Sequence, residues 1–511
     1  MKSFKYIAAA LLSLAIVSCD DHIEAKRIGG ETENVTIKSD FGMNLVGRVT
    51  VDGQPRAGVV VSDGITVATT DNEGVYQMYT NNRQHVFISV PEDCEVPVNF
   101  DGSPAFYKEL NFSSSSIIQR DFALRSCEKK TEWTLYAFAD PQVGNDTDVS
   151  DLTNVVMPGI LGFTSTFSGN AYGVCLGDIV WNAPSLFESC KAQMQRANVP
   201  VFCVIGNHDH NETVKNDTES DKEYRDAMGP TYYSVNIGDC HIVTLDDILY
   251  SGVNGRNDYA QTITKAQLEW LEKDLSYVSR DKALVICLHA PTKRRAASTH
   301  VTNNEELYAL VKDFKDVQIL SGHTHNNFTT TIAQNITETT FGAVMGAYWY
   351  PICNDGSPRG FGVLKFNGNK LADKYYQGSE TPREYQMAVY APSEAVLWQP
   401  SAKAGDPYDK ILINVFCWHS DWTVEVQEDG GSWKTLDPAT DRTGTPAWDP
   451  AVHAQVDVTT GYLPANHNTA APENNNDHMF LYKPASDSWK TVNVKATDPY
   501  GNVYTSSVNN K

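Results

Sequence analysis

Five apolar segments in the middle of the chain each run into a short cluster of side chains that can hold metal ions. In chain order the clusters are Asp140-Pro141-Gln142, Gly177-Asp178, Gly206-Asn207-His208-Asp209, His289 and Gly322-His323-Thr324-His325. They offer carboxylate, amide and imidazole groups and no thiolate, a donor set that suits Mn, Fe, Zn or Ni. Ions held by such groups activate water and stabilise negative charge, so the residue types indicate metal-assisted hydrolysis.

The clusters share one position relative to the elements that must carry them. Each follows an apolar run of strand length, such as residues 134–139 before Asp140, and helical segments such as 264–278 alternate with these runs. This alternation predicts an α/β sheet, in which ligands bind beyond the carboxyl ends of the strands. Clusters spread over residues 140–325 can therefore meet at one site, although each one alone is typical of an ordinary turn or a structural histidine.

Together and in this order, the clusters resemble the five sequence blocks of the calcineurin-like metallophosphoesterases. That family includes purple acid phosphatases, protein Ser/Thr phosphatases and cyclic-nucleotide phosphodiesterases, and the resemblance covers residues 131–372. It implies hydrolysis of a phosphoester by a hydroxide that bridges two divalent transition-metal ions. It also implies the family's central α/β domain.

The resemblance implies a role for each residue of the clusters. Asp178 would bridge the two ions. The remaining ligands would be Asp140, Gln142 and His325 at the first metal and Asn207, His289 and His323 at the second. His208 would contact the phosphate and protonate the leaving oxygen as a general acid, and Asp209 would orient its imidazole.

This sequence departs from the family pattern at two places. The first block commonly reads Asp-x-His, whereas here Gln142 puts a neutral amide oxygen in place of an imidazole. Family members often carry Asp after the Gly-Asp block, where this chain has Trp181 and Asn182. We expect the amide to weaken the first metal site without abolishing it. The identity of the metals stays open.

Trp349 and Arg359 follow the last metal block in a loop that would approach the metals at this point of the fold. They offer a stacking surface and a phosphate-binding fork, which favours a small substrate with a flat or sugar-like body. Aromatic packing and an ordinary turn explain these two residues equally well.

A chain of 511 residues is too long for one hydrophobic core. Strand-like alternation with Asp-Gly turns predicts β-sandwiches on both sides of the α/β domain, and the first resembles the carboxypeptidase-regulatory module. The predicted order is a signal peptide at 1–19, a tether at 20–40, a β-sandwich at 41–127, the metallophosphoesterase domain at 131–375 and a second β-sandwich at 383–511.

The N-terminus has the features of an export signal. Lys2 and Lys5 precede an apolar run that is too short for a permanent membrane helix and ends in Ile16-Val17-Ser18-Cys19. This ending resembles the bacterial lipobox, so Cys19 is expected to carry a lipid that holds the protein at the cell envelope. An ordinary signal peptide with a chance cysteine is the alternative.

Composition narrows the range of functions. The net charge of −22 opposes binding to nucleic acids, so the expected partner is a small phosphoester, with the membrane contacted only through the lipid. Two alternatives stay open: a phosphodiesterase, for example one that cleaves a cyclic nucleotide, and a catalytically inactive relic that only binds.

Overall fold

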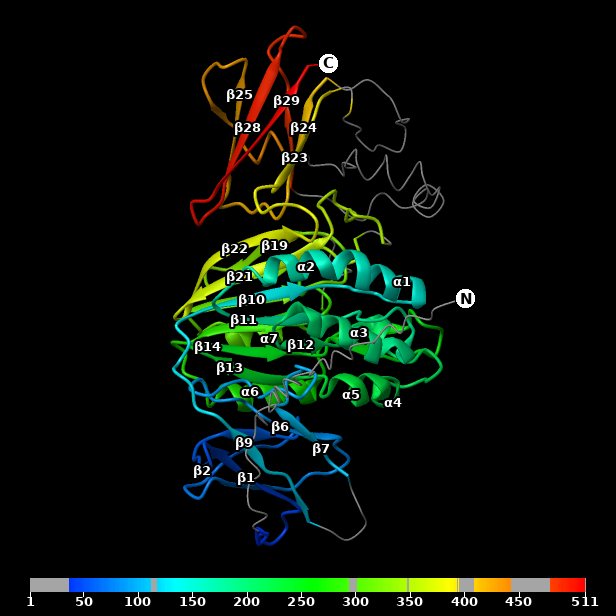
Figure 1. Ribbon diagram of the computed structural model, residues 1–511, viewed down its shortest axis with the longest axis vertical. Helices are drawn as coiled ribbons and strands as arrows, with labels where there is room; N and C mark the ends of the chain where they lie inside the picture. Colours follow the sequence, from blue (N-terminus) through cyan, green and yellow to red (C-terminus); the bar gives the residue numbers. More distant parts are fainter. Residues whose placement is uncertain are drawn as a thin grey trace, which may run out of the picture.

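The computed structural model describes residues 36–111, 117–293, 301–346, 349–392, 394, 409–442 and 478–510. The predicted signal peptide, the lipobox with Cys19 and most of the tether lie outside the described residues. Figure 1 shows an elongated molecule in three tiers, with the first strands at one end, a central α/β domain and the last strands at the other end. In the described part, none of the helices combines the length and the apolarity that crossing a membrane requires.

Two mixed sheets form the central domain. The first has the strand order β12 (Val201–Val204), β11 (Asn170–Leu176), β10 (Glu132–Phe138), β21 (Gly360–Asn367) and β22 (Lys370–Gly378). The order in the second is β13 (Tyr233–Ile237), β14 (Cys240–Thr244), β17 (Ala283–Cys287), β18 (Asp316–Ser321), β20 (Ile336–Thr340) and β19 (Phe328–Ala333). Strands β10, β11 and β12 run parallel, as do β14, β17, β18 and β20, so their carboxyl ends share an edge.

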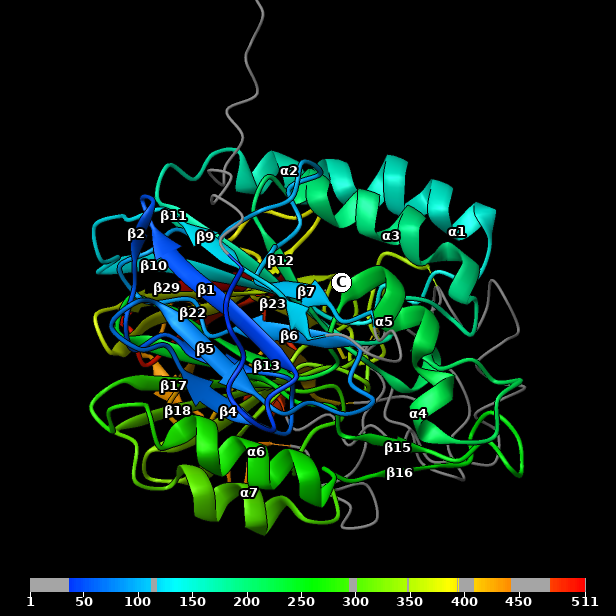
Figure 2. The ribbon, with the colours of Figure 1, turned by 90° about the horizontal axis from the view of Figure 1, so that it is seen from below.

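Helices cover both outer faces of the paired sheets. Figure 2 shows α1, α2 and α3 along one side of the strands and α6 and α7 along the other. The helices are α1 (Asp146–Asp151), α2 (Met157–Thr164), α3 (Phe187–Met194), α4 (Asp217–Ser220), α5 (Lys222–Met228), α6 (Lys265–Leu275) and α7 (Asn304–Val311), with a π-helix (Leu152–Val156) joining α1 to α2. A short hairpin, β15 (Ile248–Tyr250) and β16 (Tyr259–Gln261), lies outside both sheets.

Helix α6 shows how the sequence pattern sets this packing. Thr264 caps its first turn by accepting a hydrogen bond from the Gln267 backbone N–H, and Leu268, Leu271 and Leu275 are buried. Trp270, on the same helix, donates from Nε1 to Ser62 Oγ of the N-terminal domain at 3.1 Å. The predicted helix is therefore confirmed, and it packs against the N-terminal domain as well as its own sheet.

β-Sandwiches occupy the two ends of the molecule. The first has one sheet of β1 (Leu45–Val51), β2 (Gln54–Pro55), β5 (Val75–Met78), β8 (Ile118–Gln119) and β9 (Phe122–Leu124) and another of β3 (Val60–Ser62), β4 (Val67–Thr69), β6 (His85–Ile88) and β7 (Tyr107–Glu109). The second pairs β23 (Met387–Tyr390), β24 (Ile411–Val415) and β27 (Met479–Tyr482) with β25 (Thr423–Glu428), β26 (Lys434–Thr435), β28 (Thr491–Thr497) and β29 (Val503–Asn509). The predicted fold class, a central α/β domain flanked by β-sandwiches, is confirmed.

Candidate metal centre

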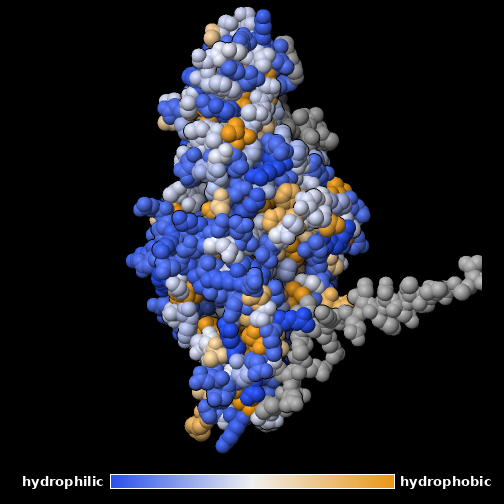
Figure 3. Space-filling view, turned by 60° about the vertical axis from the view of Figure 1, so that its left-hand side comes forward, coloured by the Kyte–Doolittle hydropathy of each residue, from blue (hydrophilic) through white to orange (hydrophobic). Residues whose placement is uncertain are grey.

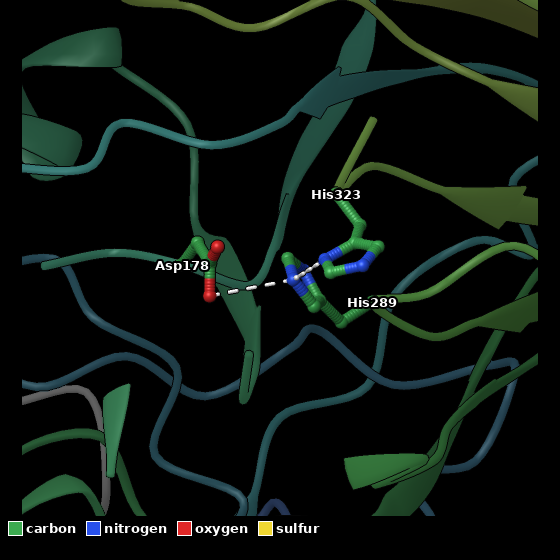
Figure 4. Close-up of side chains that lie close together, drawn as sticks. All are labelled: Asp178, His289 and His323. Atoms are coloured by element: carbon green, nitrogen blue, oxygen red, sulfur yellow. Dashed lines mark hydrogen bonds and ion pairs between the residues drawn. The ribbon is translucent and has the colours of Figure 1, made fainter. Parts of the chain in front are cut away.

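Four of the predicted ligands meet beyond the carboxyl ends of neighbouring strands: Asp178 after β11, Asn207 after β12, His289 after β17 and His323 after β18. Figure 4 shows His289 between Asp178 and His323. His289 Nε2 lies 3.3 Å from Asp178 Oδ1, 3.0 Å from His323 Nδ1 and 3.0 Å from Asn207 Oδ1. Neighbouring ligands of one transition-metal ion lie about 3 Å apart, because each sits about 2 Å from the ion. The set therefore fits one divalent ion.

A hydrogen bond on its far side fixes the His289 imidazole. Nδ1 lies 2.8 Å from the Leu176 carbonyl oxygen and donates to it, which leaves the Nε2 lone pair for a metal. The backbone N–H groups of His289 and Ala290 donate to the Asp247 carboxylate at 3.2 and 2.9 Å. Asp247 is not among the predicted site residues, although it follows the apolar strand β14 just as the five clusters follow their strands.

Gln261 of β16 holds the other imidazole of this set. Its side-chain amide lies 2.9 Å from His323 Nε2. With the amide group turned by a half-turn, its oxygen would accept a hydrogen bond from the Nε2–H of His323 and leave Nδ1 for a metal. A single glutamine in a short hairpin carries no sequence signal for this role.

The other predicted ligands make two further contacts, one of them with Asp178. Gln142 donates from Nε2 to Asp178 Oδ2 at 2.8 Å, and His325 Nε2 lies 3.4 Å from Asp140 Oδ1. Among the described residues no hydrogen bond reaches Asp140 Oδ1 or Gln142 Oε1, and both atoms are buried. Buried oxygens without a donor are costly, and a cation beside them removes that cost. The residues present thus fit a second ion as well.

Charge within the site favours an ionised bridging carboxylate. Burial opposes the ionisation of Asp178, but the His289 and His208 imidazoles outweigh it and hold the Asp178 pKa well below its usual range. Burial also acts to lower the pKa of His289, but Asp178 raises it above its ordinary value. An incoming cation must displace the proton on His289, so metal affinity is expected to fall as the pH falls.

The partner of the His208 imidazole differs from the prediction. Its Nδ1 lies 3.1 Å from Asn182 Oδ1. Asp209, which was expected to orient this ring, instead accepts hydrogen bonds from the Val180 and Gly206 backbone N–H groups. Burial and the nearby Asp178 raise the pKa of Asp209 to about 8. Asp209 therefore braces the loop, and Asn182 orients the imidazole.

The two predicted substrate-binding residues both have partners within the fold. Arg359 is 5% exposed, and its Nε and Nη2 donate to Glu380 Oε2 at 2.8 and 2.7 Å. Its fork is thus occupied by a carboxylate and does not serve as a phosphate binder. Trp349 is half-buried and packs against the hydrophobic core beside the first sheet. Both residues have the structural roles that the sequence had left as alternatives.

Backbone strain is concentrated at the ligands. Five of them, Asp140, Gln142, Asp178, His323 and His325, have φ between 43° and 66°, in the left-handed region that disfavours side chains with a Cβ. Each such residue costs about 1–3 kcal/mol and persists only where its surroundings hold it in place. The fold therefore stabilises an unfavourable backbone conformation at these residues, which directs their side chains toward one another.

Unequal affinity of the two metal sites is expected, because the Gln142 amide oxygen donates less charge than an imidazole nitrogen. Dialysis against a mild chelator should remove one ion before the other, and Gln142→His should retain that ion longer. Metal content followed during dialysis measures both effects. Gln193→His on α3, away from the site, is the control and should change neither. Two ions of equal affinity in the natural protein would contradict this assignment.

Three family models match the chain. The model described as calcineurin-like phosphoesterase matches residues 135–327, and those for the N terminal and the C terminal of calcineurin-like phosphoesterase match residues 43–127 and 338–504. Among curated proteins there is no match.

The solved structures that resemble the chain are distant in sequence. A dimetal phosphatase from Danio rerio is 15% identical, and the match covers 48% of this chain and 96% of that one with a TM-score of 0.34. A purple acid phosphatase from yellow lupin (Lupinus luteus) is 16% identical, and the match covers 63% of this chain and 69% of that one with a TM-score of 0.36. The family models, whose matches fill most of residues 43–504, carry the assignment. The chain therefore belongs to the calcineurin-like phosphoesterases and is a metal-dependent phosphoesterase of a family that uses two divalent metal ions.

Proposed function

We propose that this enzyme hydrolyses small organic phosphoesters at the cell envelope, with His208 as the general acid. The observation that carries the proposal is the position of His208 against the metal centre. Its backbone N–H donates to Asp178 Oδ1 at 2.8 Å, and its Nδ1 is engaged by Asn182. Nε2 is the ring nitrogen that is left to carry a proton to the leaving oxygen.

When bound, two divalent ions supply the positive charge that phosphoester cleavage requires and allow water to attack at neutral pH. The protein contributes orientation and proton transfer. Asp178 and the ligands around it fix where the phosphoryl group can lie, and His208 stands beside that position. Burial lowers the pKa of His208, which makes its protonated form a stronger acid than a free imidazolium and reduces the fraction that is protonated at neutral pH.

The surroundings of His208 support a small substrate. The Trp181 ring lies 5.0 Å from the His208 ring, tilted by 35°, and is half-buried, so it offers an aromatic surface next to the leaving group. Such a surface suits a flat or sugar-like body. The net charge of −22 repels long polyanions, and the face in Figure 3 is mostly hydrophilic, with small separate hydrophobic areas.

A substrate panel tests the proposal. Sugar phosphates, nucleotides, cyclic nucleotides, phospholipid head groups and a phosphoprotein should each be supplied with Mn and with Zn, and the small monoesters should give the highest kcat/KM. Faster turnover of an aryl diester than of the matching monoester would reassign the enzyme as a phosphodiesterase. Preference for the phosphoprotein would refute the small-substrate proposal.

Attachment to the envelope is proposed to depend on the lipobox alone. Cys19→Ala should block lipidation and move the protein from the membrane fraction to the soluble fraction, because the rest of the chain shows no apolar run long enough to anchor it. Ser18→Ala keeps the small residue before the cysteine and serves as the control, which should remain with the membrane. A Cys19→Ala protein that stays in the membrane fraction would contradict the anchor.

A further inference from the structure

A chain of buried polar groups leads from the metal-ligand loop toward the C-terminal sandwich. It starts at Asn327, two residues after His325. The backbone N–H of Asn327 donates to Asp355 Oδ2 at 2.6 Å. Asp355 Oδ1 accepts from the backbone N–H and the hydroxyl of Ser357 at 2.9 and 2.6 Å. Asn327 also donates from Nδ2 to Ser357 Oγ at 2.7 Å. The segment that carries His323 and His325 is thereby tied to the loop that carries Asp355.

The C-terminal sandwich completes the chain. Asn414 of β24 donates from Nδ2 to the Asp355 carbonyl oxygen at 2.7 Å, and its Oδ1 accepts from His478 Nδ1 at 2.6 Å. His478 Nε2 lies 3.3 Å from Asp355 Oδ2. Cys417 Sγ donates to Asn327 Oδ1 at 3.4 Å, so the sandwich also reaches Asn327 directly. All five residues are at most 4% exposed.

The loop needs such support, because His323 and His325 have φ of 66° and 56°. Strained residues keep such a conformation only when their surroundings hold both ends of the segment. At the first end, the His323 backbone N–H donates to Asp140 Oδ2 at 2.8 Å. At the other end, the segment is held by the hydrogen bond from Asn327 to Asp355. Asn414 and His478 of the sandwich contact Asp355 in turn and fix its position.

We infer that Asp355, Asn414 and His478 are positioning residues for the metal centre. Through them the C-terminal sandwich holds His323 and His325 in the conformation that can bind metal. The sandwich is thus a part of the metal site, beyond any role in shaping the approach to it. This inference concerns metal affinity and holds whichever phosphoester the enzyme cleaves.

Metal titration of full-length variants tests the inference. Asp355→Asn replaces one acceptor oxygen with an NH2 group, which faces either Asn327 N–H or the Ser357 donors, and His478→Leu removes the link to Asn414. In calorimetric titration of apo-protein with Mn, each should lower the affinity of at least one site about tenfold to a hundredfold. Cys417→Ala removes a single neutral hydrogen bond and should lower the metal affinity only about fivefold.

A second Asp–His–Asn chain in the same protein, with a buried aspartate and histidine and a half-buried asparagine, supplies the matched control. His241 Nε2 lies 2.8 Å from Asp274 Oδ2 and its Nδ1 lies 3.0 Å from Asn236 Oδ1, and this chain contacts none of the predicted ligands. Asp274→Asn should lower the melting temperature as Asp355→Asn does, yet leave the metal affinity unchanged. The double variant Asp355→Asn with His478→Leu should lose less metal affinity than the product of the two separate fold-losses, because both changes break the same chain of hydrogen bonds.

Unchanged metal affinity in Asp355→Asn and His478→Leu would overturn the inference. An equal loss in Asp274→Asn would also overturn it, because the loss would then reflect general destabilisation. Should Asp355→Asn or His478→Leu fail to fold, Cys417→Ala decides. Metal affinity equal to that of the natural protein in Cys417→Ala would count against the inference. Failure of the natural protein to cleave any phosphoester in the substrate panel would sink the proposed function but would leave these metal affinities as they are.

Discussion

Replacing Asp178 with Asn is expected to lower turnover by about a thousandfold or more and to reduce the metal content. Asp178 accepts hydrogen bonds on both oxygens and stands between the two groups of predicted ligands. Asn keeps the shape of the side chain but removes the negative charge that faces both ions. The ions contribute several kcal/mol of transition-state stabilisation, which corresponds to a loss of at least about three powers of ten.

The control for this variant is Asp274→Asn, which makes the same change at a buried carboxylate bonded to His241 and Ser234, away from the metal centre. It should retain both ions and natural turnover per folded molecule. The measurements are kcat/KM on an aryl phosphate and metal content per chain. Natural turnover in Asp178→Asn would remove the basis for the metal assignment.

His208→Ala is expected to keep both ions and to lower kcat by about a hundredfold or more on substrates with poor leaving groups. Its side chain belongs to neither group of predicted ligands, and its ring contacts Asn182 and Trp181. A good leaving group such as nitrophenolate departs without a proton, so the loss should be much smaller on that substrate.

The comparison of an alkyl phosphate with nitrophenyl phosphate is therefore the decisive measurement for His208. An equal loss on both substrates would show that the imidazole binds the phosphate without transferring a proton. Loss of metal in this variant would place His208 among the ligands instead. Neither result would affect the assignment of Asp178.

That Asp178, Asn207, His289 and His323 meet at one place could be predicted from sequence, because the signal is local. Each of the five clusters follows its own apolar strand, and parallel strands bring their carboxyl ends to one edge whatever the loops between them do. Helix α6 was predictable for the same reason, since the spacing of Leu268, Leu271 and Leu275 reports directly on one buried face. The fold class follows from such patterns alone.

The partners of the functional side chains were not predictable, because they depend on contacts between distant segments. The pairing of Arg359 with Glu380 and of His208 with Asn182 follows from how loops pack, which no periodicity records. Asp209 stands next to His208 in sequence, but it accepts backbone N–H groups of its surroundings and leaves the imidazole to another loop. Adjacency in sequence was a poor guide to adjacency of side chains.

The left-handed backbone at the ligands bears on whether the site is a working one. Glycine adopts such φ values without strain, so exchanging the strained Asp, Gln and His residues for glycine would relieve the fold. This chain carries Asp140, Gln142, Asp178, His323 and His325 at the strained positions instead of glycine. Side chains that strain the backbone yet can hold ions are what a working metal site requires, which argues against an inactive relic.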